Sequence, residues 1–411
     1  MKYLLMKYLC QHFFATTMHS HAGAMETRKK DLNKMTIKAV ELFAGIGGFR
    51  LACDQLGIKT IWANDIDDNA SKIYQKNFNS GIFVQDDIIK QLDSIPNHQL
   101  LTAGLPCQPF SSAGKKKGIS DPRGTLFELL VQILKTHSPT FFVLENVKRL
   151  LSMAKGLHFA TILDSLSSLD YLIEWRLLNA IDFGLPQHRE RVILIGSKNP
   201  VPPKSFLCSH RDISVISTNQ LNQIARVEKW TNIIKHDDKF PNWGLSYHHK
   251  FIGEHLTAFS AAQKSVRLKE IIQKQVDPAF DFTRETLTRL KSSQRVEKYY
   301  NGVEIVYNQK GGARMGYTIF GINGVAPTLT SSTSRHYERY QIGSQYRRLT
   351  PIEYARIQGF PDNHCEGVSV YDQYALYGNA VPPPMVKWVI NRLITNQFIT
   401  INDLNNQMEL F

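Results

Sequence analysis

The sequence has few cysteines, and none of them stands in a pattern that marks a metal site or a disulfide framework. No Cys-x-x-Cys pair occurs in the 411 residues, and no histidine cluster with metal-ligand spacing is present. The five cysteines are Cys10, Cys53, Cys107, Cys208 and Cys365. Scattered cysteines of this kind are typical of a reducing compartment. The sequence therefore predicts no bound metal and no disulfides, and we expect a cytoplasmic protein.

Long apolar runs are also missing, and we expect no secretory signal peptide. No stretch approaches the roughly 20 apolar residues of a membrane span, so we expect no contact with membranes. Near the start, Lys7, Gln11 and His12 interrupt the apolar side chains, which is unlike the core of a signal peptide. Because Met25 and Met35 both offer a later start, we expect residues 1–36 to be a disordered or misannotated extension.

Acidic residues are scarce relative to basic ones. The chain has 49 Lys and Arg against 36 Asp and Glu, which gives a formal net charge of +13 and a pI of about 9.4. Between Val201 and Tyr346, twenty basic residues stand against twelve acidic ones, so this part holds +8 of the excess. Aromatic residues such as Trp230 and Trp243 are interleaved there. This charge favours a polyanionic partner such as nucleic acid.

Residues 37–200 alternate short apolar runs with amphipathic segments. The expected strands are Lys38–Phe43, Thr60–Asn64, Gly81–Val84, Leu100–Ala103, Phe141–Glu145 and Arg191–Ile195. The expected helices between them are Phe49–Leu56, Asp68–Phe78, Thr125–Thr136 and Leu157–Leu169. This alternation predicts an α/β fold: a Rossmann-like, mostly parallel sheet with helices on both faces. Such sheets bind ligands beyond the carboxyl ends of their strands.

The regular pattern fades after Pro202 and returns near Thr350. We therefore expect a catalytic domain at residues 37–200, a smaller irregular domain at 201–346, and a segment at 347–411 that returns to the first domain. Thr350 followed by Pro351 is typical of a helix start with proline at its first position. The segment Asn379–Ile394 is also expected to be helical after its proline-rich opening.

A glycine-rich turn follows the first expected strand. Glu41–Phe49 reads ELFAGIGGF, so a strand leads through glycines into a helix and lets backbone approach a ligand closely. The dinucleotide pattern GxGxxG is absent, and an ordinary tight turn is the alternative. Asp65 ends the next strand, where an acidic residue accepts hydrogen bonds from ribose hydroxyls, and Asp87-Ile88 ends the third. Together these strand ends indicate a cofactor that carries adenosine.

Three further segments place reactive side chains at strand ends. Cys107 lies on a loop between prolines, which would hold a nucleophile rigidly, although a lone cysteine is more often a core residue. Glu145 is a candidate acid or hydrogen-bond donor, and an ordinary strand-end carboxylate is the alternative. Gln187, Arg189 and Arg191 alternate, so in a strand they would point to one side; a solvated charged run is the alternative.

Taken together, these segments resemble the cytosine-C5 DNA methyltransferase family over about residues 37–200 and 345–390. The matching motifs, in the family's order, are FAGIGG at Phe43–Gly48, PCQ at Pro106–Gln108, RGTLF at Arg123–Phe127, ENV at Glu145–Val147, QxRxR at Gln187–Arg191, RLTPIE at Arg348–Glu353, QGFP at Gln358–Pro361 and GNAV at Gly378–Val381. The resemblance implies an enzyme that transfers a methyl group from S-adenosylmethionine to C5 of a cytosine flipped out of duplex DNA. It also implies a bacterial restriction-modification system.

The resemblance further implies roles for individual residues. The Cys107 thiolate would add to C6 of the base, Glu145 would bind N3 and the exocyclic amine, and Arg191, supported by Arg189, would bind O2. The residues implied around the cofactor are Phe43, Gly45, Gly48, Asp65, Ile66, Asp87, Ile88, Pro106, Leu126, Asn379 and Val381. The residues expected on DNA are Ser111, Lys115, Lys116 and Lys117 in a lid after the nucleophile, and Arg314, Arg335 and Arg339 in the target-recognition domain at 201–346.

Other functions remain as rival interpretations. A relative that methylates cytosine in tRNA would use the same catalytic set, but the basic, aromatic recognition region favours DNA. A non-catalytic DNA-binding protein is disfavoured by the intact catalytic set, and a nicotinamide dehydrogenase by the missing GxGxxG pattern and the PCQ loop. We expect a monomer that acts on double-stranded DNA, separately from any cognate restriction endonuclease.

Overall fold

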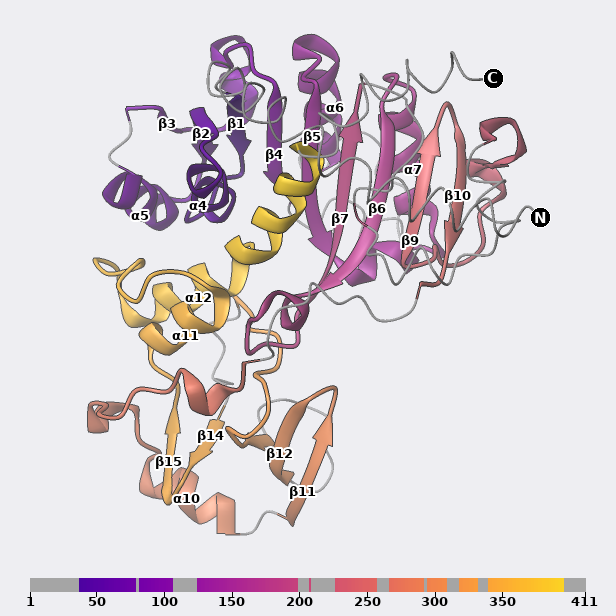
Figure 1. Ribbon diagram of the computed structural model, residues 1–411. Helices are drawn as coiled ribbons and strands as arrows, with labels where there is room; N and C mark the ends of the chain where they lie inside the picture. Colours follow the sequence, from indigo (N-terminus) through magenta and orange to yellow (C-terminus); the bar gives the residue numbers. More distant parts are fainter. Residues whose placement is uncertain are drawn as a thin grey trace, which may run out of the picture.

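The computed structural model contains two β-sheets with a pair of helices between them (Figure 1). It describes residues 37–78, 81–105, 124–198, 207, 226–256, 266–291, 294–308, 318–331 and 339–394. Within these ranges, no helix is long and apolar enough to cross a membrane.

The large sheet contains the strands that the alternating pattern predicts. From one edge to the other, its strands are β3 (Phe83–Gln85), β2 (Lys59–Asp65), β1 (Lys38–Leu42), β4 (Leu100–Gly104), β5 (Phe141–Val147), β7 (Glu190–Ser197), β6 (Leu172–Asn179), β9 (Trp243–Tyr247), β10 (Lys250–Glu254) and β8 (Thr231–Asn232). Strands β1 to β5 are parallel, whereas β7 is antiparallel to both of its neighbours. The start of β7 therefore meets the carboxyl ends of the parallel strands.

Helices cover both faces of this sheet, as predicted. The helices of the first half are α4 (Gly48–Gln55), α5 (Asp68–Phe78), α6 (Gly124–His137) and α7 (Leu157–Ser167). In β1, Ala39 packs with Phe49 of α4 and Val386 of a helix over residues 383–394, whereas Val40 packs on the opposite face with Leu130 of α6. Because successive strand residues point to opposite faces, this alternation buries both sides of the sheet.

The small sheet is built from the second half of the predicted recognition region. Its strands, in spatial order, are β11 (Gln294–Tyr300), β12 (Val303–Asn308), β13 (Thr318–Phe320), β14 (Arg339–Ile342) and β15 (Gln345–Arg348), and α10 (Arg284–Lys291) precedes them. Strands β8 to β10 also come from residues 201–346, but they extend the large sheet: β9 pairs with β6, β10 with β9, and β8 with β10. That range is thus divided between two sheets, and its limits as a recognition domain stay a prediction.

The two sheets are joined by α11 (Pro351–Gln358) and α12 (Val370–Asn379). The predicted start of α11 is confirmed: Thr350 caps it, with Pro351 in the first turn, and the Thr350 hydroxyl and the Glu353 carboxylate accept each other's backbone N–H. Glu353 is buried and forms a two-bond ion pair with Arg347 of β15 at 2.6–2.8 Å. This pair anchors the small sheet to α11.

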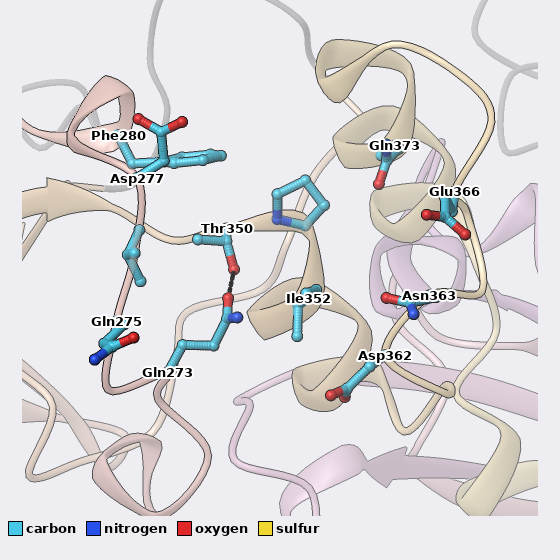
Figure 2. A pocket seen from close by; sticks show the side chains of 12 residues that line it. Gln273, Gln275, Asp277, Phe280, Thr350, Ile352, Asp362, Asn363, Glu366 and Gln373 are labelled. Carbon is cyan, nitrogen blue, oxygen red and sulfur yellow. Dashed lines mark hydrogen bonds between the residues drawn. The ribbon is translucent and has the colours of Figure 1, made fainter.

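A cavity of about 300 Å³ lies at this joint (Figure 2). Gln273, which Figure 2 shows bonded to Thr350, also donates its backbone N–H to Glu353 at 2.9 Å. The cavity is lined by amide and carboxylate side chains, among them Asp362, which is paired with Arg356 at 2.6 Å. The joint is therefore held by several hydrogen bonds and ion pairs between polar side chains.

The C-terminal segment agrees with the sequence prediction of a helix after its proline-rich opening. Within Asn379–Ile394, α12 ends at Asn379 and a second helix covers residues 383–394. Pro382, Pro383 and Pro384 explain the break, because proline cannot donate the backbone bond that a helix interior needs and is best accommodated in a first turn.

Candidate active site

The turn after β1 depends on left-handed backbone angles. Phe43, Gly45 and Gly47 have φ values of 52°, 53° and 80°. At Gly45 a Cβ would meet no atom within 4 Å, so the turn is open there, whereas at Gly48 a Cβ would lie 2.3 Å from the carbonyl oxygen of Val381. The GNAV segment therefore packs directly against the start of α4, and only glycine fits this contact without movement.

Asp65, at the end of β2, holds the turn through a backbone hydrogen bond. Its Oδ2 accepts from the backbone N–H of Gly45 at 2.7 Å, and its Oδ1 accepts from that of Asp67 at 3.0 Å. Burial raises the pKa of this carboxyl above its ordinary value, although the backbone hydrogen bonds act in the opposite direction. The next side chain, Ile66, is 68% exposed. The structure thus brings three of the expected cofactor residues together.

Two adjacent isoleucines that follow β3 differ in exposure. The Asp87 side chain caps the short helix Ile88–Lys90 by accepting from the backbone N–H of Ile89 at 3.1 Å. Ile88, an expected cofactor residue, is buried in the core, whereas Ile89 is 48% exposed. Ile89 is not among the residues predicted above, because nothing in the sequence of two adjacent isoleucines after a strand indicates which side chain is exposed.

The other expected cofactor residues lie at or near the same edge. Phe43 and Leu126 are partly buried against the core beneath the sheet. Asn379 ends α12 and is exposed, and Val381 is buried, with its Cγ2 atom 3.6 Å from the position of a Cβ on Gly104. Val381 therefore lies between the glycine turn and the end of β4.

Glu145 and Arg191 form an ion pair at the ends of β5 and β7. The Nε of Arg191 lies 2.7 Å from Oε1 of Glu145, and each side chain is roughly nine-tenths buried. The register explains the contact: Val147 pairs with Arg191 in the antiparallel ladder, so Glu145 and Arg191 are diagonal neighbours on one face. The backbone N–H of Leu105 donates to the carbonyl oxygen of Glu145 at 3.3 Å. The pair thus lies where the polypeptide leaves β4.

Arg189 points to a different place from Arg191. Its guanidinium is buried and donates to three backbone carbonyl oxygens, those of Leu329 at 2.9 Å, Gly378 at 2.9 Å and Ala380 at 3.0 Å. Arg189 therefore binds the GNAV segment to the chain that follows β13. These bonds connect Arg189 to backbone atoms of the neighbouring segments, and its expected support of Arg191 stays a prediction.

Gln187 strengthens the same junction. Its side-chain oxygen accepts from the backbone N–H of Leu329 at 2.9 Å, and its nitrogen donates to Gln358 of α11 at 3.1 Å. The neighbouring backbone of His188 donates to Ala326 at 2.8 Å. From the sequence, Gln187 is predicted only as part of the QxRxR motif, on the basis of its alternation with two arginines. Its buried partners, Leu329 and Gln358, come from distant segments and could not be predicted from this pattern.

Several expected residues lie outside the described residues. They are Pro106 and Cys107 of the nucleophile loop, Ser111, Lys115, Lys116 and Lys117 of the expected lid, and Arg314 and Arg335 of the recognition region. Arg339 is described: it is half-buried on β14, where it pairs with Arg348 of β15 in the antiparallel ladder. In the part of the chain that the structure describes, no group of three or more His, Cys, Asp or Glu could hold a metal ion.

A buried carboxyl beneath the turn was not expected from the sequence. Glu41 of β1 is almost fully buried and accepts a hydrogen bond from the Tyr74 hydroxyl of α5 at 2.9 Å. Burial raises the pKa of Glu41 to about 8. Its only sequence signal is a charged residue inside an apolar strand.

Comparisons with known proteins agree on one family. Residues 37–395 match the model of the C-5 cytosine-specific DNA methylase family. The chain is 32% identical to the type II methyltransferase M.Sau3AI of Staphylococcus aureus over 410 residues, covering 91% of this chain and 99% of that protein. It is 29% identical to M.HhaI of Haemophilus parahaemolyticus, covering 88% and 95%.

Solved structures match the fold. The Entamoeba histolytica methyltransferase EhMeth superposes with a TM-score of 0.60 at 21% identity, covering 89% of this chain and 99% of that one. The S. pombe Dnmt2 methyltransferase superposes with a TM-score of 0.60 at 19% identity, covering 88% and 99%. At these identities the likeness concerns the architecture alone.

Proposed function

The chain belongs to the C-5 cytosine-specific DNA methylase family and is a DNA cytosine-C5 methyltransferase, and from this premise we propose how its residues perform the transfer. The proposal is that Cys107 attacks C6 of a cytosine flipped out of duplex DNA, while Glu145 and Arg191 bind the base. S-adenosylmethionine is the proposed methyl donor.

The observation that carries this proposal is the Glu145–Arg191 pair beside the end of β4. A carboxylate and a guanidinium 2.7 Å apart offer an acceptor and several donors side by side, which complements the amine, N3 and O2 edge of cytosine. Leu105 is bonded to Glu145, and Cys107 follows Leu105 by two residues. Two residues of chain span at most about 7 Å, so the thiol is within reach of a base held by this pair.

The proposed chemistry begins with nucleophilic addition. C5 of cytosine is a weak nucleophile, but when the Cys107 thiolate forms a bond to C6, the electrons of the C5–C6 double bond become available at C5. As this bond forms, N3 takes up a proton from water, the Glu145 carboxylate accepts hydrogen bonds from N3–H and the exocyclic amine, and the Arg191 guanidinium donates to O2. N3 releases this proton to water when the ring is restored. Once C5 carries the methyl group, a water molecule takes its proton, the C6–sulfur bond breaks, and Cys107 leaves as the thiolate with the ring restored.

The residues at the turn fit the proposed cofactor. The open side of Gly45 leaves room for a ligand, the exposed side chains of Ile66 and Ile89 offer apolar surfaces, and Asp65 keeps acceptor lone pairs beside the turn. When bound, S-adenosylmethionine supplies the electrophilic methyl group. Val381 lies between this turn and Gly104, so it would separate the cofactor side from the base side.

We further propose that residues of the small sheet and the loop after Cys107 bind the DNA. The net charge of +13 and the excess between Val201 and Tyr346 support a polyanionic partner. Arg339, Arg314, Arg335 and the lysines Lys115, Lys116 and Lys117 are the proposed contacts. A type II relative that spans nearly the same length supports a role in protecting DNA against a restriction endonuclease.

The direct test is transfer of tritium from labelled S-adenosylmethionine to duplex DNA or to tRNA. We expect label in DNA only, and label confined to tRNA would overturn the substrate assignment in favour of the RNA alternative. Duplexes that contain 5-fluorocytosine distinguish the mechanism, because fluorine cannot leave as a proton does and the enzyme should remain attached through Cys107. Bisulfite sequencing of DNA from expressing cells then identifies the recognised sequence.

A further inference from the structure

The loop after α11 reaches back to the glycine turn. In this loop His364 is 2% exposed, and its Nε2 lies 2.7 Å from the carbonyl oxygen of Ile46, in the middle of the FAGIGG segment. The two residues are 318 positions apart in the chain. A buried side chain from the C-terminal segment therefore contacts the backbone of the glycine turn. Asp65, at the end of β2, is bonded to the same turn at Gly45.

The contact determines which nitrogen of the His364 ring carries the hydrogen. Burial lowers the pKa of His364 below its ordinary value, so the imidazole is neutral at neutral pH and carries one hydrogen. The carbonyl oxygen of Ile46 can only accept, so the hydrogen must be on Nε2. The Nδ1 atom is buried without a hydrogen-bond partner among the described residues. Only one of the two tautomers makes the bond to the turn.

Neighbouring contacts hold the ring in place. The His364 carbonyl oxygen accepts from Asn77 of α5 at 2.8 Å, and Lys76 donates to the carbonyl oxygen of Glu366 at 2.7 Å. The imidazole lies 4.8 Å from the Phe360 ring and 6.0 Å from the Phe78 ring. Residue His364 is therefore attached to both its own loop and α5.

Helix α5 also restricts the residue type at Gly47, the next residue of the turn. A Cβ on Gly47 would lie 2.3 Å from the Phe78 ring, so Gly47 packs on the ring that also lies near His364. The carbonyl of Ile46 and the N–H of Gly47 belong to one planar peptide group. A bond to this carbonyl consequently fixes the orientation of the peptide plane directly before the left-handed Gly47.

We propose that His364 is a positioning residue for the cofactor turn. The Nε2–H of His364 and the carboxylate of Asp65 hold consecutive parts of the turn, at Ile46 and Gly45, so that the open side of Gly45 keeps its shape before a ligand arrives. This inference rests on the proposed S-adenosylmethionine site. It adds to that site a residue from the loop after α11, which does not itself touch the ligand.

The test compares two substitutions at this position. His364→Phe keeps a ring between Phe78 and Phe360 but removes the donor, and His364→Gln keeps an amide N–H near the place of Nε2. Isothermal titration calorimetry with S-adenosylhomocysteine measures binding without turnover. We expect the dissociation constant to rise about tenfold in His364→Phe and to stay within about threefold of the parent in His364→Gln. The KM for S-adenosylmethionine should follow, whereas kcat at saturation should change little.

His158→Phe is the matched control. His158 is a buried histidine of α7. Helix α7 packs on β6 and β9, whereas the glycine turn lies between β1 and α4 in another part of the sheet (Figure 1). The His158→Phe substitution should lower the thermal stability of the protein without weakening its binding of S-adenosylhomocysteine. Equal binding by the parent and His364→Phe would overturn the proposal, whereas a parent that binds no S-adenosylhomocysteine would refute the cofactor site itself.

A spectroscopic measurement keeps the proposal testable if His364→Phe does not fold. Long-range proton–nitrogen correlation spectra of the ligand-free protein report which ring nitrogen carries the hydrogen. We expect the His364 signals to be those of a neutral ring with the hydrogen on Nε2 at pH 7, and signals of the Nδ1–H tautomer would contradict the proposal.

Discussion

On one side of the sheet edge, around the glycine turn, the contacts are hydrogen bonds to backbone atoms: Asp65 accepts from Gly45, and His364 donates to Ile46. On the other side, the central contact joins two oppositely charged side chains, Glu145 and Arg191. The shape of the first side depends on the backbone angles of the turn. The second presents fixed charges whose positions depend on the antiparallel register of β5 and β7.

This difference predicts which property, cofactor binding or reaction rate, a substitution on each side should change. Backbone geometry changes gradually when one contact is lost, so substitutions at the turn should weaken cofactor binding by moderate factors. A charged group that acts on the reacting base contributes mainly in the transition state, so its loss should lower the rate and leave cofactor binding unchanged. The following substitutions test this separation, from the largest expected effect to the smallest.

Cys107→Ser removes the proposed nucleophile and should reduce methylation at least about 1000-fold, because a serine hydroxyl is far less acidic than a thiol. Binding of S-adenosylhomocysteine and of duplex DNA should be retained, which calorimetry and gel-shift assays measure. An active serine variant would disprove covalent catalysis by this residue.

Arg191→Lys keeps the charge but loses the planar fork that reaches both Glu145 and the base. We expect kcat to fall about 100-fold with an almost unchanged KM for S-adenosylmethionine. The matched control is Arg189→Lys, two residues earlier, which loses bonds to buried carbonyl oxygens and should lower the melting temperature instead. If both variants lose rate without losing stability, the division of roles between the two arginines is wrong.

Gly48→Ala tests the cofactor side. The added Cβ would lie 2.3 Å from the Val381 carbonyl oxygen, so the GNAV segment must move away from the turn. We expect about tenfold weaker binding of S-adenosylhomocysteine and about 1–3 kcal/mol lower stability. Gly81→Ala, where a Cβ meets no atom within 4 Å, is the control and should change neither quantity.

Glu41→Gln should have the smallest effect on methylation and on S-adenosylhomocysteine binding, because it is expected to change the stability of the protein instead. Because the pKa of Glu41 rises from its ordinary value of 4.5 to about 8 on folding, the folded protein binds more protons than the unfolded one between these values. Stability should therefore fall as pH rises from about 4.5 to about 8, by at most about 1.4 kcal/mol per pH unit. Glutamine mimics the protonated acid and should flatten this slope in melting experiments from pH 5 to pH 8.5. Parallel slopes in both proteins would contradict the assignment.

The sequence predicts the parallel half of the large sheet well, because its strands are apolar runs and four of them, β1, β2, β4 and β5, are followed by a helix with clear periodicity. It misses β6, in which Glu174 and Arg176 are buried inside an otherwise apolar strand. Glu174 is satisfied by the indole N–H of Trp243 at 2.7 Å, a partner from β9. Charges in a strand suggest exposure until such a partner is known, so the extension of the sheet through β8 to β10 could not be foreseen.

The sequence indicates which residues belong to the candidate site, but it does not indicate how some of them contact one another. Alternation placed Arg189 and Arg191 on one side, as it would within a strand, but β7 begins at Glu190, so Arg189 precedes the regular ladder and turns toward the GNAV segment. His364 carried no signal because its contact spans 318 residues. Local patterns identify side chains with chemistry, whereas the partners of buried polar groups depend on long-range topology.

The helix over residues 383–394 has a consequence for the order in which the protein folds during synthesis. Its side chains Met385, Val386 and Val389 pack on the same sheet face as Ala39 and Phe49. When β7 leaves the ribosome, this helix still lies roughly 200 codons ahead, which is about 10–40 s of translation. During that delay the apolar side chains on this face of the nascent sheet lack part of their cover, and they gain it only when residues 383–394 emerge.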